Sequence, residues 1–292
     1  MIYITKLGLP SLKQEIQYIQ FENRTYLGTF YPFKIFADKG LEEVLFDTIT
    51  IFYGGNGSGK STLINVLARK MQSIRYSDFN DAPLFDTYTN MSRIEYYRKP
   101  PNSYVLTSDD VFDYVLNARN VNEKLEERRN EIVDRYFQVH EEYRNNPQIR
   151  NLQGIDDFER WKEVSHILSP KKSMSSMVRK KVERSVDLGS NGETAMQYFV
   201  DRMDEPGVYL LDEPENSVSI DFQMQLVEYI LATSVATRTQ FVIATHSPIF
   251  LSIPNARIYN LDAYPVETCE WTELPNVRKY YDFFMQHKHE FE

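Results

Sequence analysis

One short segment of the sequence has the composition and spacing of a phosphate-binding loop. Residues 54–61 read Gly-Gly-Asn-Gly-Ser-Gly-Lys-Ser and satisfy the pattern G-x-x-x-x-G-K-[ST]. Glycines let the backbone curl until successive N–H groups point at one anion, while Lys60 would add a positive charge for the β- and γ-phosphates. The Ser61 hydroxyl is a ligand that Mg²⁺ accepts. We therefore expect ATP with Mg²⁺ to bind at Gly54, Gly55, Asn56, Gly57, Ser58, Gly59, Lys60, Ser61 and Thr62.

Two carboxylates follow a second apolar segment. Residues 208–211 are Val-Tyr-Leu-Leu, and Asp212 and Glu213 come directly after them. Such acids lie at the carboxyl edge of a parallel sheet, where phosphate loops also lie. We expect Asp212 to hold Mg²⁺ through its water shell and Glu213 to act as general base on the attacking water. Paired acids are common in turns, but the following Pro-Glu-Asn-Ser strengthens this interpretation.

A histidine follows a third apolar segment. Residues 241–245 lead directly to His246, and Ser247-Pro248 comes next. A histidine placed there can reach a γ-phosphate, whereas a lone histidine is more often structural. With the two preceding motifs present, we expect Lys60, Glu213 and His246 to be catalytic.

The residues 190–193, Ser190-Asn191-Gly192-Glu193, resemble the signature loop L-S-G-G-[QE] of ABC-type ATPases. The four motifs together resemble the chromosome-maintenance and recombination-repair branch of that class. The resemblance implies that this loop contacts the γ-phosphate bound by a second copy, so that two copies meet head to tail around ATP. It also implies that Asn216-Ser217 crosses the dimer interface.

A closer resemblance is to small stand-alone bacterial ATPases that are labelled AAA-family. They share an S-[NH]-G-E signature, a strand like Tyr31-Pro32-Phe33 before the phosphate loop, and a tail like residues 271–291. This resemblance implies a role in DNA maintenance or antiphage defence, beside a separately encoded nuclease or toxin. The alternative is a nucleotide-gated scaffold with little turnover that regulates such a partner.

Two departures from the family pattern favour slow hydrolysis. No glutamine stands where the family has its Q-loop, and the best positional candidates are Ser108 and Asp109 within 107–110. Asn191 also replaces the first glycine of the signature.

The elements that must position these residues alternate between strands and helices. Residues 1–53 are predicted to be extended, with 44–53 as a buried strand that feeds the loop. We further predict strands at 207–211, 240–245 and 257–261, helices at 61–72, 194–203 and 222–233, and helices over 111–161 that part near 145–147. The expected fold is α/β, an ABC-type P-loop ATPase head with a mostly parallel sheet flanked by helices. An antiparallel β portion precedes it within 1–110, a helical lobe is inserted at 111–185, and 186–292 completes the head.

Composition limits the remaining choices. The 292 residues carry a net charge of −9, which argues against coating nucleic acid with the whole surface. A basic segment at 170–185 could still bind DNA or an acidic partner, and the alternative is a solvated helix face. No stretch of eighteen apolar residues occurs, and Cys269 is the single cysteine, so we expect a cytoplasmic protein that does not contact the membrane. His287 and His289 lack further ligands at metal-site spacing.

Overall fold

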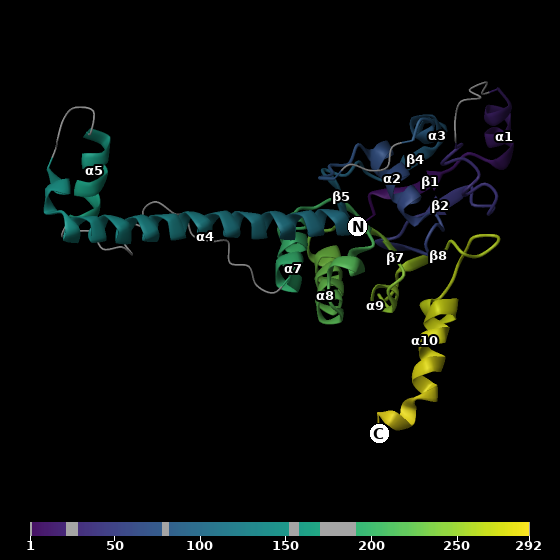
Figure 1. Cartoon of the computed structure of the whole chain (residues 1–292). Coiled ribbons are helices and arrows are strands. Elements are labelled where there is room, and N and C mark those ends of the chain that lie inside the picture. The colour runs from purple at the N-terminus through teal and green to yellow at the C-terminus, as the bar shows by residue number, and fades with distance from the viewer. Residues whose placement is uncertain (1, 22–28, 78–81, 152–157, 170–190, 292) are drawn as a thin grey trace. The chain divides into compact units, whose positions relative to one another are not determined.

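The computed structural model describes residues 2–21, 29–77, 82–151, 158–169 and 191–291 (Figure 1). By their internal contacts the residues form two units, Met1–Tyr114 together with Ser190–Glu292, and Val115–Gly189. The first unit holds two β-sheets and the helices around them, and the described residues of the second are mostly helical. Within the described part of the chain, no helix is both long and apolar enough to cross a membrane.

The larger sheet of the first unit has six strands in the order β5-β6-β7-β3-β8-β9. These are β3 (Ile49–Tyr53), β5 (Ser103–Thr107), β6 (Val208–Asp212), β7 (Gln240–Thr245), β8 (Arg257–Asn260) and β9 (Glu267–Thr268). Neighbours from β5 through β8 run parallel, and β9 pairs antiparallel with β8. Every residue of β3 and β7 is buried, as expected where helices cover both faces of a parallel sheet. The predicted α/β class is confirmed.

The smaller sheet is antiparallel, with β1 (Ile4–Gly8) between β2 (Glu43–Leu45) and β4 (Arg93–Tyr96). The prediction of one strand over 44–53 was wrong, because β2 and β3 belong to different sheets. A turn parts them, in which Asp47 N–H donates to Thr50 Oγ1 and Thr48 N–H donates to Asp47 Oδ1. The fully buried Gln240 joins the two sheets, since its side chain bonds the backbone of Tyr3, Ile4 and Asp47.

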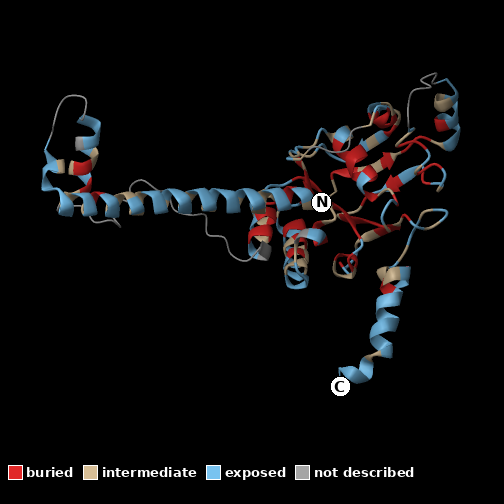
Figure 2. Ribbon diagram, in the orientation of Figure 1, coloured by how far each residue is buried: buried red, intermediate tan, exposed pale blue. Residues whose placement is uncertain are grey.

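Helices lie on both sides of the larger sheet. Figure 1 places α2 (Lys60–Met71) and α3 (Phe85–Met91) on one side, and α7 (Asn191–Arg202), α8 (Ile220–Ala236) and α9 (Pro248–Leu251) on the other. The chain ends in η4 (Trp271–Glu273), α10 (Pro275–Gln286) and η5 (Lys288–Glu290). Buried residues gather on the sheet strands and on α2, while α10 is mostly exposed (Figure 2). The helix that follows the predicted phosphate loop is therefore embedded in the core.

Among the first fifty residues, β1 and β2 are extended as predicted, but two other described segments are not. Leu12–Phe21 forms helix α1, and residues 31–40 form successive turns, so Tyr31-Pro32-Phe33 is not a strand. Ser11 begins the helix, because its N–H donates to Gln14 Oε1 and its hydroxyl accepts from Gln14 N–H. The turns are held against α1 by the buried carboxyl of Glu15, whose Oε2 accepts from Lys34 N–H at 2.6 Å.

The described residues of the second unit are mostly helical. Helix α4 (Ser108–Asn145) has 38 residues, η1 (Pro147–Arg150) follows it, and α5 is Phe158–Ile167, so the predicted break near 145–147 is confirmed. Within the unit, Val139 packs with Val164 and Ile167. Two hydrogen bonds from Arg135 to the Glu163 carboxylate join α4 to α5. The basic segment 170–185 and Ser190 lie outside the described residues.

Candidate nucleotide site

The predicted phosphate loop lies between the end of β3 and the start of α2. Gly57 and Gly59 have φ values of 78° and 107°, which favour glycine. A Cβ on Gly59 would also lie 2.8 Å from Phe36 Cε1 and 2.9 Å from Ile35 Cγ2. The loop therefore passes closely against the turns at 31–40. Since it opens directly into the N-terminus of α2, its N–H groups and the helix dipole favour an anion there.

Two side chains far along the sequence hold this loop from outside. The Asp262 carboxylate accepts a hydrogen bond of 2.9 Å from Gly55 N–H. The Lys39 ammonium donates to Ser58 O at 2.9 Å and to Leu261 O at 2.6 Å, which ties the loop to the end of β8. Sequence reasoning missed both residues. The one available signal was that Asp262, like Asp212, follows the end of an apolar segment.

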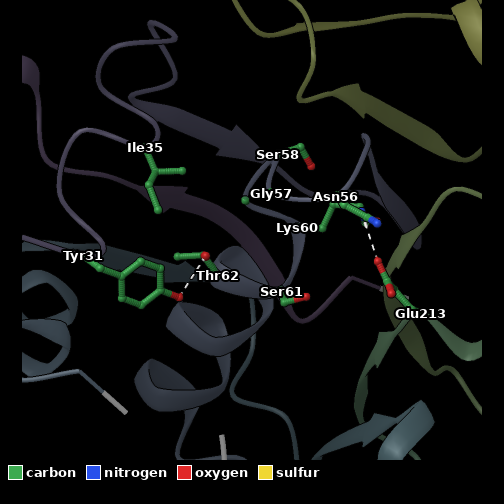
Figure 3. Close-up of a pocket in the computed structure, with 10 residues that line it drawn as sticks. Tyr31, Ile35, Asn56, Gly57, Ser58, Lys60, Ser61, Thr62 and Glu213 are labelled. Carbon is green, nitrogen blue, oxygen red and sulfur yellow. Dashed lines mark hydrogen bonds and ion pairs between the residues drawn. The ribbon is translucent and has the colours of Figure 1, made fainter. Parts of the chain in front are cut away.

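The Lys60 side chain is buried and has oxygen partners on both sides. Its Nζ donates to Gly54 O at 2.9 Å and to Gly55 O at 3.1 Å. The same atom lies 3.1 Å from Glu213 Oε1 (Figure 3). A buried charge is costly unless it is paired, and here two carbonyls and a carboxylate satisfy it. The structure thus brings Lys60 of the phosphate-loop motif into contact with Glu213, the second of the two carboxylates that follow β6.

Ser61 and Asp212 also meet. The Ser61 hydroxyl donates to Asp212 Oδ1 at 3.0 Å. Burial raises the pKa of Asp212 to about 6, the bond from Ser61 opposes that rise, and the charge of Glu213 adds to it. A hydroxyl and a carboxylate are hard oxygen ligands, and Mg²⁺ favours such ligands. This donor set therefore fits the predicted metal, with Ser61 and Asp212 as the residues that would hold it.

Glu213 sits in an unusual backbone conformation, with φ 48° and ψ 52°. Its N–H donates to Ala244 O at 2.9 Å, which fixes the residue at the end of β6 against β7. Its Oε2 accepts from Asn216 Nδ2 at 2.9 Å, while Oε1 contacts Lys60. The carboxylate is therefore held at the phosphate loop from two sides. Backbone strain of this kind is common where a catalytic group must be aimed.

Two pockets open beside the loop and share Ser61 and Glu213. The first, of about 510 Å³, is lined by residues 56–62 together with Tyr31, Ile35 and Glu213 (Figure 3). Tyr31 also reaches the helix, with its hydroxyl 3.0 Å from Thr62 Oγ1.

The second pocket, of about 380 Å³, adjoins Asp212. It is lined by Ser61, Asn65, Arg75, Ser77, Thr107, Ser108, Asp109, Asp212, Glu213 and Asn216. Ser108 and Asp109, the positional candidates for the missing glutamine, therefore line the same pocket as Ser61 and Asp212. They begin α4, where Asp110 Oδ2 accepts from both the N–H and the hydroxyl of Thr107. Sequence reasoning missed Arg75, whose Nη1 donates to Asn65 Oδ1 at 2.9 Å.

His246 lies just beyond the end of β7, next to the strand that carries Asp212. Its Nδ1 is 3.2 Å from Glu215 Oε1, and its side chain is half-exposed. The histidine motif thus reaches the same sheet edge as the two carboxylates. Sequence reasoning named His246 but not the carboxylate that contacts it.

One protein-family model matches part of this chain. The family described as "AAA domain, putative AbiEii toxin, Type IV TA system" matches residues 197–252, which include both carboxylates and the histidine. The comparison with curated proteins found no match.

Several solved structures are similar to most of this chain. One is the Smc head domain bound to a ScpA domain, from Pyrococcus furiosus, which is 12% identical with a TM-score of 0.41. The match covers 97% of this chain and 100% of the Smc chain. "An inward-facing conformation of a putative metal-chelate type ABC transporter" is 16% identical, with coverage of 80% and 76% and a TM-score of 0.36. Stu0660 of Streptococcus thermophilus is 12% identical, with coverage of 77% and 72% and a TM-score of 0.40.

The segment that resembles an ABC-type signature is described only from Asn191 onward, where Asn191-Gly192-Glu193 form the first turn of α7. Among the described residues, α7 contributes none to the lining of either pocket. The assignment of Ser190, Asn191, Gly192 and Glu193 to a nucleotide bound by another copy therefore stays a prediction.

Proposed function

We propose that the protein binds Mg²⁺–ATP, hydrolyses it, and uses nucleotide-dependent head-to-tail dimerisation as a switch. The P-loop ATPase-like fold supports nucleotide binding. The observation that carries the finer proposal is the contact of Lys60 Nζ with Glu213 Oε1 at 3.1 Å, beside the bond from Ser61 to Asp212. A phosphate-binding lysine and a general base must lie this close to act on one γ-phosphate.

The contacts of Lys60 suggest how binding could prepare catalysis. An arriving γ-phosphate would offer the ammonium a new anion, so that Lys60 exchanges the Glu213 carboxylate for phosphate oxygen. Glu213 Oε1 would then be free to accept a proton from the attacking water, whose oxygen bonds to the γ-phosphorus as ADP leaves. Mg²⁺ held by Ser61 and Asp212 would neutralise charge on the phosphates.

Dimerisation is supported by the resemblance of residues 190–193 and 216–217 to loops that act across a dimer interface. Asn216 bonds the Glu213 carboxylate, so a partner that touched residues 216–217 would also affect the general base. We propose that ATP favours the closed pair, that hydrolysis opens it, and that the process is DNA maintenance or antiphage defence.

A second candidate function is a low-turnover, nucleotide-gated scaffold that controls a separately encoded nuclease or toxin. Asn191 in place of a signature glycine, and Ser108 and Asp109 where a glutamine is expected, favour it. The matching family's description also mentions a toxin. The basic segment 170–185 would be its contact with DNA or an acidic partner.

Phosphate release and mass in solution test the proposal together. Wild type should release phosphate only with Mg²⁺, Lys60→Ala should lose ATP binding, and Glu213→Gln should bind ATP and remain dimeric. The loss of the general base should lower turnover about 100-fold or more. A Glu213→Gln chain that stays monomeric with saturating Mg²⁺–ATP would contradict the switch. Dimerisation with negligible wild-type turnover would favour the scaffold.

A further inference from the structure

Glu215 is a buried carboxylate that the roles proposed so far do not use. It lies in η3 (Pro214–Ser217), two residues after the general base, and is only 8% exposed. Its Oε1 accepts from the Thr245 hydroxyl at 2.7 Å and from His246 N–H at 2.8 Å. A buried carboxylate needs such donors to offset its lost hydration. These two bonds join the segment that carries the general base to the end of β7.

The same Oε1 also faces the imidazole of His246, with Nδ1 at 3.2 Å. A lone pair on Nδ1 would be repelled by the carboxylate at that distance, which favours a proton on Nδ1. A carboxylate against one ring nitrogen sets the tautomer and leaves the other nitrogen for a ligand. The ring of His246 is half-exposed, and no described residue forms a hydrogen bond or ion pair with its Nε2.

Two further bonds keep this segment rigid. Ser247 N–H donates to Thr245 Oγ1 at 3.0 Å, and the Ser247 hydroxyl donates to Gln223 Oε1 of α8 at 2.7 Å. The backbone on both sides of His246 is therefore anchored, and ring rotation is its main remaining freedom. The contact with Glu215 opposes that rotation.

We propose that Glu215 is a positioning residue that holds His246 in the Nδ1-protonated tautomer, with Nε2 presented to the γ-phosphate region. The role of His246 at the γ-phosphate rests on the proposed ATPase function. The tautomer of its ring rests only on the contact with Glu215. Removal of Glu215 should therefore change the tautomer of His246, and ATP turnover should fall as a consequence of that change.

The tautomer can be measured without nucleotide. Nitrogen-15 NMR of histidine-labelled protein should show the Nδ1–H pattern for His246, whose signals are assigned by their loss in His246→Gln. Glu215→Ala should convert this pattern to a tautomer mixture or to the Nε2–H form. Glu228→Gln, which neutralises an exposed acid on α8, should leave it unchanged. An Nε2–H pattern in wild type, or an unchanged pattern in folded Glu215→Ala, would overturn the proposal.

A second variant covers the case in which Glu215→Ala does not fold. Glu215→Gln keeps the shape and an acceptor oxygen, and we expect turnover to fall about 10-fold with Mg²⁺–ATP affinity nearly unchanged. Added to His246→Gln, it should lower turnover by no more than about 2-fold, because both act through one ring. If the double variant instead lost turnover by the product of the two single-variant factors, the two residues would act independently and the proposal would be contradicted. A wild-type chain without ATP turnover would refute the proposed function, and the NMR result would still decide the role of Glu215.

Discussion

The Ser61 hydroxyl donates a hydrogen bond of 3.0 Å to the Asp212 carboxylate, although 151 residues separate them in the sequence. Ser61 ends the phosphate-loop motif and Asp212 ends β6, so the parallel sheet brings the two motifs to one edge. We expect Ser61→Ala to weaken nucleotide binding about 10-fold or more in the presence of Mg²⁺.

The same variant should bind nucleotide almost normally in EDTA, since the loop amides and Lys60 remain. Titration calorimetry with and without Mg²⁺ measures the difference. Ser252→Ala, which removes an exposed hydroxyl at the end of α9, serves as the matched control. An equal loss under both conditions would argue against a metal ligand at Ser61.

The two positive-φ glycines of the loop should respond differently to alanine. At Gly59 the new methyl would meet Phe36 and Ile35 within 3 Å, whereas at Gly57 no atom lies within 4 Å. Gly57→Ala should therefore cost only the conformational strain, about 1–2 kcal/mol. Gly59→Ala should cost about 1–3 kcal/mol more, because side chains must also shift. Urea denaturation gives both values, and equal destabilisation would show that the turns at 31–40 do not press on the loop.

Lys39→Met should destabilise the protein and loosen the phosphate loop. It leaves Ser58 O and Leu261 O without their ammonium donor, which costs about 1–3 kcal/mol for buried acceptors. Burial lowers the pKa of Lys39, and the negative charge of Asp262 opposes that shift. Thermal denaturation and Mg²⁺–ATP affinity are the measurements. Lys13→Met on α1 removes an exposed lysine and should change neither.

Glu15 should make stability depend on pH. Burial raises its pKa to about 7 from 4.5, so the folded state holds the proton more tightly than the unfolded chain does. The tighter proton binding stabilises the folded state. This stabilisation is complete below about pH 4.5 and is lost as the pH rises through 7.

Glu15→Gln removes that dependence, and its Oε1 can still accept from Lys34 N–H. We compare the unfolding free energy of the variant with that of wild type at each pH. The variant-minus-wild-type difference should be about 2 kcal/mol more favourable to the variant at pH 8 than at pH 5. Denaturant titrations at the two pH values measure it. Glu42→Gln, an exposed acid, should show no such difference. A gain that is equal at both pH values would mean that Glu15 does not titrate on folding.

Much of the head could be predicted because its signals are local. The strands predicted at 207–211 and 240–245 and the helix predicted at 61–72 are close to their observed bounds, since uninterrupted apolar runs and helical spacing each need only neighbouring residues. Helix α1 and strands β4 and β5 were not predicted. They are short, and β4 joins its sheet only by pairing with β1, which lies far from it in the sequence.

The sequence by itself determined which residues could do chemistry: the glycine-rich loop with Lys60 and Ser61, the carboxylates Asp212 and Glu213, and His246. Residue type and spacing suffice for that, because a tight loop or a strand end is a property of a few adjacent residues. Only the tertiary structure decided that Lys60 faces Glu213, that Lys39 and Asp262 brace the loop, and that Glu215 faces His246. Each of these is a contact between separate elements, and the packing of the sheet, rather than any local preference, sets the distance between them.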